Sequence, residues 1–106
     1  MSINAVIDFN KFEGPVYAGR ERAERLREVL AMDRIDASNE SVSVVIPDQT
    51  YSVTSSFFLG LFAPSIIKAG SKVAFLNKFR FNAPDYVMED FDAYITRALV
   101  DNSSFQ

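Results

Sequence analysis

The chain has 106 residues, of which 48% are hydrophobic and 24% charged, a balance typical of one soluble globular domain. Eleven Lys and Arg against 14 Asp and Glu give a net charge of −3, which disfavours binding to nucleic acid or to an acidic membrane. There is no Cys and no His, so disulfides, thiolate zinc sites and Ser-His-Asp triads are excluded. We therefore expect a non-enzymatic protein without a metal or cofactor.

The sequence carries no pattern that would direct it to a membrane or out of the cell. The segment Met1–Phe9 has no basic residue, unlike a signal or transit peptide. The longest apolar stretch, Phe57–Ile67, is far shorter than the roughly 20 residues that cross a bilayer. A cysteine-free composition suits a reducing compartment, so we expect a cytoplasmic protein.

The N-terminal half alternates strand and helix patterns. Ile3–Phe9 alternates in hydrophobicity and predicts a first strand. Gly19–Met32 has helical apolar spacing and predicts a helix, whose arginines alternate with glutamates and indicate a solvated face rather than a nucleic-acid surface. These arginines are Arg20, Arg22, Arg25 and Arg27. We expect a loop at Asp33–Ser41 and, at the β-branched run Val42–Ile46, a central strand buried on both faces.

The C-terminal half predicts three helices and one short strand. The hydroxyl residues Thr54-Ser55-Ser56 precede a long apolar run and are candidates for a helix N-cap. Within that run Pro64 is expected to kink or restart the helix, and Gly70 to end it. Ser71–Lys78 suits a short helix capped by Ser71, with a strand as the alternative, and Phe79–Phe81 suits a strand.

The last helix is expected to begin at Pro84. Four apolar residues recur in it at a spacing of four: Val87, Phe91, Ile95 and Leu99. Strands that alternate with helices predict a single compact α/β domain over residues 1–101, with a small mixed or mainly parallel sheet packed against three to four helices. Residues 102–106 are expected to form a flexible tail.

The apolar helix leaves two interpretations open. Phe57, Phe58, Leu61, Phe62 and Ile66 form one stripe, and further apolar residues occupy much of the remaining surface. A helix that is apolar all round is either buried or exposes apolar surface to a partner. Either the last helix covers it, or it binds a partner protein or a second copy of the chain.

Two segments resemble a known family. Gly14–Arg22, running into Leu26–Leu30, resembles the Gly-Pro, Gly and Leu pattern of a bacterial STAS-like family of unknown function, the DUF4325 group. Val44–Phe62, with Ser55-Ser56-Phe57 after a strand, resembles that family's Ser-Ser-Phe segment. It is more distantly similar to the STAS domains of anti-sigma-factor antagonists, whose Asp and Gly at this turn correspond to Thr54 and Phe57.

The resemblance implies a cytoplasmic, regulatory domain that acts by binding a protein. In the antagonists the partner is a histidine-kinase-like ATPase, which phosphorylates a Ser in the turn and thereby abolishes the complex. Carried onto this chain, the phosphoacceptor falls on Ser56, with Ser55 beside it. The partner-binding surface would comprise Thr54, Phe57, Phe58, Leu61 and Phe62.

A different class of function is the alternative. A small nucleotide-binding protein or a carboxylate-dependent enzyme would have its site at the carboxyl ends of the strands, near Asp48, Ser55 and Ser56. A pocket there containing a carboxylate of raised pKa would favour this alternative. The acidic residues Glu89, Asp90 and Asp92 point in different directions on a helix and indicate a solvated face rather than a metal site.

Overall fold

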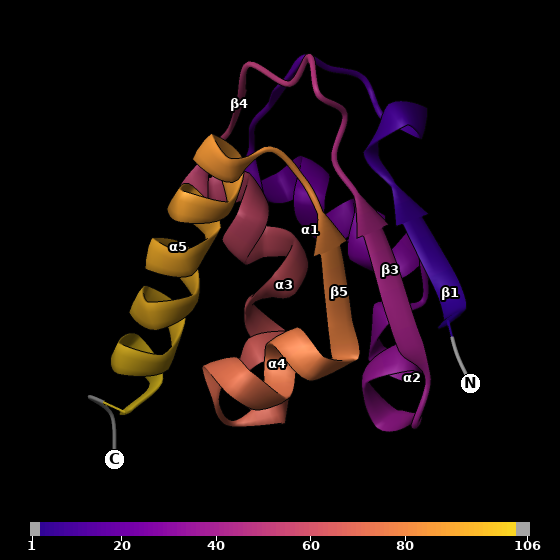
Figure 1. Cartoon of the computed structure of the whole chain (residues 1–106). Coiled ribbons are helices and arrows are strands. Elements are labelled where there is room, and N and C mark those ends of the chain that lie inside the picture. Colours follow the sequence, from indigo (N-terminus) through magenta and orange to yellow (C-terminus); the bar gives the residue numbers. More distant parts are fainter. Residues whose placement is uncertain (1–2, 104–106) are drawn as a thin grey trace.

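The structure is a computed structural model that describes residues 3–103 (Figure 1). The elements, in chain order, are β1 (Ile3–Asp8), the 3-10 helix η1 (Phe9–Lys11), β2 (Val16–Tyr17), α1 (Arg20–Val29), α2 (Met32–Ala37), β3 (Ser41–Val45), β4 (Ser52–Val53), α3 (Ser55–Ala69), α4 (Lys72–Lys78), β5 (Phe79–Asn82) and α5 (Asp85–Ser103).

Two small parallel sheets organise the chain. The larger has the strand order β1-β3-β5, with Ile7 beside Val44 and Val44 beside Phe81. The smaller pairs β2 with β4. Helices follow strands along the chain, as a parallel sheet requires. The predicted α/β class, with a mainly parallel sheet, is confirmed.

The larger sheet is covered on one face. Val42 and Val44 of β3 are buried, whereas Ser43 and Val45, which point to the other face, are half-buried. Helices α1, α2 and α3 all lie behind the sheet in the view of Figure 1. The central position predicted for this strand is correct, but the prediction that both its faces are buried is wrong, because no helix within residues 3–103 covers the front face.

The region after α1 differs from the sequence prediction. The first helix ends at Val29, and Ala31 adopts a left-handed conformation with φ of 55°. A second helix, α2, then occupies part of the predicted loop. Although most of its residues are polar, α2 buries two apolar side chains, Met32 and Ile35. Because they are three residues apart, both lie on the same face of the helix and pack into the core together.

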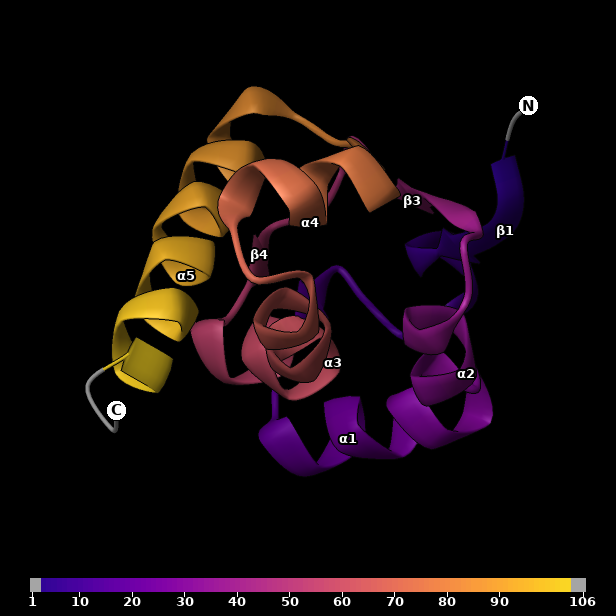
Figure 2. The ribbon, with the colours of Figure 1, turned by 90° about the horizontal axis from the view of Figure 1, so that it is seen from below.

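Helix α3 lies at the centre of the helices, with α1, α4 and α5 around it (Figure 2). It continues through Pro64 without a restart and ends at Gly70, which has φ of 89°. Gly60 allows α1 to approach closely, because a Cβ at this position would lie 2.9 Å from the Ala23 Cβ and from the Arg20 carbonyl oxygen.

The C-terminal elements match their predictions closely. Ser71 caps α4 by accepting a hydrogen bond from the Ala74 amide, and the strand β5 follows directly. The last helix, α5, begins one residue after Pro84 and extends to Ser103. It therefore includes the first two residues of the predicted tail, and residues 104–106 lie outside the described part of the chain.

The core is rich in phenylalanine. Phe62 of α3 contacts the rings of Phe75, Phe79 and Phe81, with centroid distances of 5.5–5.9 Å. Phe58 lies 4.4 Å from Phe91 of α5. Aromatic pairs at these distances add stabilisation beyond their buried area, so this cluster joins α3 to every element that follows it.

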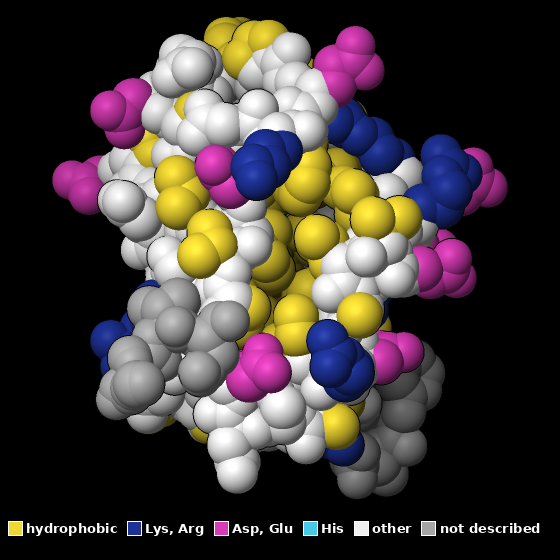
Figure 3. Space-filling view, turned by 90° about the vertical axis from the view of Figure 1, so that its right-hand side faces the viewer, with side chains coloured by type: hydrophobic (Ala, Val, Ile, Leu, Met, Phe, Trp, Pro, Cys, Tyr) yellow, Lys and Arg dark blue, Asp and Glu magenta, His cyan; other side chains and the backbone are white. Residues whose placement is uncertain are grey.

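The side of the molecule beyond β1 is hollowed, and Figure 3 shows apolar side chains in the hollow with charged groups around it.

Within residues 3–103, no single helix is long and apolar enough to cross a membrane. Only α3 and α4 taken together reach that length and hydrophobicity, and they meet at a bend of 111°.

Candidate functional site

The aromatic face of α3 is not a surface. Phe57, Phe58, Leu61 and Phe62 each have 0% exposure. Phe57 packs against Phe9 and Tyr17, whereas Phe58 and Phe62 pack against aromatic rings of α4, β5 and α5. The sequence prediction that they bind a partner is therefore wrong for this structure. Of the two interpretations left open for the helix, burial applies to this stripe.

The opposite face of α3 is accessible instead. Ser56, Leu59, Ala63 and Ile67 follow one another at spacings of three and four residues, so they share one face of the helix. Ile67 is 42% exposed and Ser56 is exposed, whereas Leu59 is buried. An apolar helix face that reaches solvent beside charged neighbours is typical of a binding surface.

Two adjoining cavities of about 550 and 250 Å³ follow this face between α1 and α5. We call them together the α3 groove. Its apolar lining comprises Leu59, Gly60, Ala63, Pro64, Ile67 and Ala98. Its charged lining includes Arg20 and Glu24 of α1, Lys68 of α3 and Asp101 of α5. The groove thus has an apolar floor and charges of both signs.

The start of α3 places Ser56 at one end of that face. Thr54 is the N-cap, since its Oγ1 accepts a hydrogen bond from the Phe57 amide at 3.2 Å. Neither Ser55 nor Ser56 is therefore needed as the cap, and Ser56 is exposed while Ser55 is half-buried. The Arg22 guanidinium lies 5.3 Å from the centre of the Phe57 ring, which places positive charge near this end of the helix.

The small sheet fixes the position of Thr54. The Thr54 amide donates to the carbonyl oxygen of Tyr17 at 2.9 Å, directly after the β2–β4 pair. The Tyr94 hydroxyl of α5 donates to the carbonyl oxygen of Val53 at 3.0 Å. The residues that lead into α3 are thus hydrogen-bonded to β2 through the Thr54 amide and to α5 through the Val53 carbonyl oxygen.

Among the described residues, two titratable groups have shifted pKa values. Burial raises the pKa of the Tyr94 hydroxyl, and the nearby Asp90 carboxylate adds to this effect. Hydrogen bonds from the backbone and then the side chain of Asn10 lower the pKa of Asp8, which caps η1. The first shift thus follows from burial and the second from the hydrogen bonds that Asp8 accepts.

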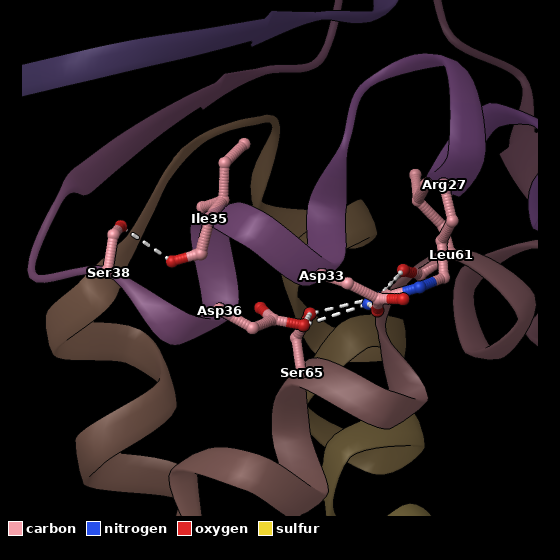
Figure 4. Close-up of polar contacts among 7 residues, drawn as sticks. All are labelled: Arg27, Asp33, Ile35, Asp36, Ser38, Leu61 and Ser65. Atoms are coloured by element: carbon pink, nitrogen blue, oxygen red, sulfur yellow. Dashed lines mark hydrogen bonds and ion pairs between the residues drawn. The ribbon is translucent and has the colours of Figure 1, made fainter.

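A buried polar network connects α1, α2 and α3 (Figure 4). Arg27 donates through Nη1 to the Leu61 carbonyl oxygen at 2.7 Å and to Ser65 Oγ at 3.0 Å. Through Nη2 it pairs with Asp33 at 2.6 Å and with Asp36 at 2.8 Å. The Arg27 side chain is only 9% exposed, so the prediction that all four α1 arginines are solvated is wrong for this one.

The sequence contained no clear sign of this network. Arg27 lies among alternating charges, and its acidic partners lie in a segment predicted to be a loop. One signal was available. Ser65, which follows Pro64 inside an otherwise apolar helix, is a polar side chain that needs a partner when buried; it donates to Asp36 Oδ2 at 2.9 Å.

A polar cavity of about 530 Å³ adjoins the network between α2, α3 and α4, and we call it the α2–α4 cavity. Its lining includes two acidic side chains, Asp36 and Glu40, and two basic ones, Lys68 and Lys78. Lys78 Nζ donates to the carbonyl oxygens of Ser38 and Glu40 at 2.7 and 3.0 Å, and so holds the α2–β3 connection in place.

The alternative site at the carboxyl ends of the strands is not assembled as expected. A cavity of about 370 Å³ lies there, lined by Asn10, Phe12, Gly14, Pro15, Tyr17, Pro47, Gln49 and Thr50. Asp48, Ser55 and Ser56 are not among its lining residues, and Asp48 is exposed.

The described part of the chain shows no group of three or more acidic side chains placed to hold a metal ion. Glu89, Asp90 and Asp92 are all exposed on α5, as the spacing predicted. Asp92 pairs with Lys72 of α4 at 2.6 Å. This acidic segment therefore belongs to the solvated face of α5.

Comparisons with known proteins give no match. No protein-family model matches the chain, and neither the curated proteins nor the solved structures contain a match to it.

Proposed function

We propose that the chain is a non-enzymatic, cytoplasmic regulatory domain that binds another protein through the α3 groove, in the manner of a STAS-like anti-sigma-factor antagonist. The observation that carries the proposal is that the exposed Ser56 lies on the same face of α3 as the half-buried Ala63 and the exposed Ile67. A hydroxyl and an apolar strip on one face form a single surface that a partner can cover.

The groove favours a helical partner. Its floor is apolar and runs along α3 between two other helices, and its edges are charged. An amphipathic helix that places its apolar side in such a groove is a common mode of recognition between proteins. Charges of both signs at the edges favour a partner helix with both acidic and basic residues on its flanks.

Ser56 offers a means of regulation at the end of this surface. A phosphoryl group on its hydroxyl adds roughly −1.5 to −2 charges at physiological pH. The amides at the start of α3 would stabilise this charge locally. A partner helix that covers the apolar face would meet the same charge at its end, so phosphorylation is expected to weaken the complex. The kinase that the resemblance suggests is a histidine-kinase-like ATPase.

Site-specific photocrosslinking in the cells that naturally make the protein tests the proposal. A photoreactive amino acid replaces Ile67 in the groove or, as a control, Val73 of α4, which is 70% exposed and lies outside the groove. We expect a discrete adduct from position 67 alone, reduced at least severalfold by Ser56→Asp. An adduct twice the mass of the chain would identify a second copy as the occupant.

Two results contradict the proposal. Equal adducts from positions 67 and 73 would show that the groove has no preferred partner. An adduct from position 67 that is unchanged by both Ser56→Asp and Leu59→Glu would show that the partner does not cover this face. Mass spectrometry of the purified protein, followed by fragmentation, checks separately whether Ser56 carries phosphate.

A further inference from the structure

The α2–α4 cavity contains an unusual carboxylate. The Asp36 side chain is 8% exposed, and its Oδ2 accepts hydrogen bonds from Arg27 and Ser65. Its Oδ1 is buried and has no hydrogen-bond partner among the described residues. Leaving a buried charged acceptor unpaired is costly, so such an atom indicates a missing donor.

The Asp36 side chain lines the cavity. In Figure 4, Oδ2 of Asp36 faces Ser65 and Arg27, and the other oxygen points away from them on the side of Ile35 and Ser38. Both Asp36 and Ser38 line the α2–α4 cavity.

The rest of the lining supplies the complementary charge. Lys68 is exposed at the C-terminal end of α3 and makes no ion pair within residues 3–103. The Glu40 side chain adds a second acidic group, and Asn39 and Asn77 add amide groups. The cavity lining therefore combines the carboxylates of Asp36 and Glu40 with the ammonium groups of Lys68 and Lys78, in a volume within the usual range for small ligands.

We propose that the α2–α4 cavity binds a small zwitterion, which places a primary ammonium group on Asp36 and an anionic group on Lys68. The ammonium has three N–H donors, so it can serve both Asp36 Oδ1 and Glu40. Binding turns the Asp36 carboxyl group slightly toward the cavity. The anionic group can be the carboxylate of an amino acid or the phosphate of a phosphorylated amino alcohol, which share this chemistry.

This site is separate from the proposed docking surface. The α2–α4 cavity and the α3 groove share Lys68 alone among their lining residues. Because Arg27 contacts both Asp36 and the α3 backbone at Leu61, an occupied cavity would also stiffen the middle of α3.

Titration of the isotope-labelled full chain, followed by amide NMR shifts, tests the proposal. Glycine and O-phosphoethanolamine are the two zwitterionic probes. Glycine betaine carries the same charges as glycine but has no N–H donor, and acetate carries the anion alone. We expect saturable shifts at Ser38–Ser41, Ser65 and Asn77 from one or both zwitterions, and none that saturate from betaine or acetate.

Two variants locate the binding groups. Asp36→Asn and Lys68→Gln are each expected to weaken binding about 10-fold or more, since each removes a hydrogen bond to a charged group. Asp92→Asn, an exposed acid on α5, is the matched control and should leave the affinity unchanged. If Asp36→Asn does not fold, Glu40→Gln replaces it, because the Glu40 side chain takes no part in the hydrogen bonds among Arg27, Asp36 and Ser65.

Three outcomes overturn the proposal. The first is the absence of saturable shifts with both zwitterions, which would mean that solvent alone satisfies Asp36. The second is equal binding of glycine and betaine. The third is an affinity that neither cavity variant changes. Each differs from the crosslinking results that would contradict a docking role for the α3 groove.

Discussion

Replacement of Arg27 by Met should destabilise the protein strongly. The arginine makes four hydrogen bonds, at 2.7 Å to the Leu61 carbonyl oxygen, 3.0 Å to Ser65, 2.6 Å to Asp33 and 2.8 Å to Asp36. Methionine preserves most of the volume but leaves the buried Asp36 carboxylate without its cation. Removing one partner of a buried ion pair costs about 3–5 kcal/mol, a large part of the ~5–15 kcal/mol that stabilises a typical domain.

The two acidic partners should contribute very differently. The Asp33 side chain is 95% exposed and that of Asp36 is 8% exposed. Solvent-exposed pairs contribute only ~0–1 kcal/mol, so Asp33→Asn serves as a matched control with a small effect. The double variant Arg27→Met/Asp36→Leu should be more stable than the two single effects predict when added, by about 1–3 kcal/mol, because it leaves no unpaired buried charge.

Urea denaturation followed by circular dichroism measures these differences, provided that the m-value is unchanged. A loss of less than about 1 kcal/mol for Arg27→Met would place it in the range of an exposed pair. A double variant whose loss of stability equals the sum of the two single losses would show that Arg27 and Asp36 are not energetically coupled. Either result would refute the conclusion that Arg27 holds α1, α2 and α3 together by neutralising a buried carboxylate.

Four further substitutions test other parts of the fold by the same measurement. Gly60→Ala should destabilise by about 1–3 kcal/mol despite the better helix propensity of alanine, because the new Cβ would lie 2.9 Å from the Arg20 carbonyl oxygen; equal or higher stability would show that α1 yields easily. Thr54→Ala should cost about 1 kcal/mol by removing the N-cap of α3, whereas Ser56→Ala should change stability little; a reversal of these two effects would assign the cap to Ser56. Tyr94→Phe should cost about 1 kcal/mol. Burial raises the pKa of the Tyr94 hydroxyl in the folded protein. The stability that the neutral hydroxyl contributes is therefore present below the pKa of the unfolded chain and is lost as the pH rises through the folded pKa. At alkaline pH, Tyr94→Phe should consequently lose less stability than the native chain.

The sequence predicted those features that depend on local patterns. The hydroxyl residues 54–56 predicted where α3 begins, although the cap is Thr54 and not Ser55 or Ser56, and Gly70 predicted where it ends, because caps and left-handed conformations have strong residue preferences. The β-branched run gave the central strand, and the spacing of Val87, Phe91 and Ile95 gave the buried face of α5. The predicted alternation of strands and helices was sufficient to give the fold class.

The features that depend on distant neighbours could not be predicted in the same way. Helix α3 is apolar on two sides, and only the position of α1 against Gly60, together with the sheet, decides that the phenylalanines face inward. Helix α2 was missed because its charges outnumber the two side chains that anchor it. Arg27 was assigned to solvent because the buried partner on α3, Ser65, is 38 residues away in sequence.

The aromatic cluster has a consequence for the chain as it leaves the ribosome. Apart from their contact with each other, Phe58 and Phe62 have their ring partners within residues 3–103 in α4, β5 and α5, the last of them at Tyr94. A nascent chain that ends before this residue holds an apolar α3 with no cover on that side, and such intermediates aggregate readily. Ribosomes that stall, or messages cut short, between codons 70 and 90 should therefore yield fragments that chaperones retain and proteases remove, and not a smaller working version of the domain.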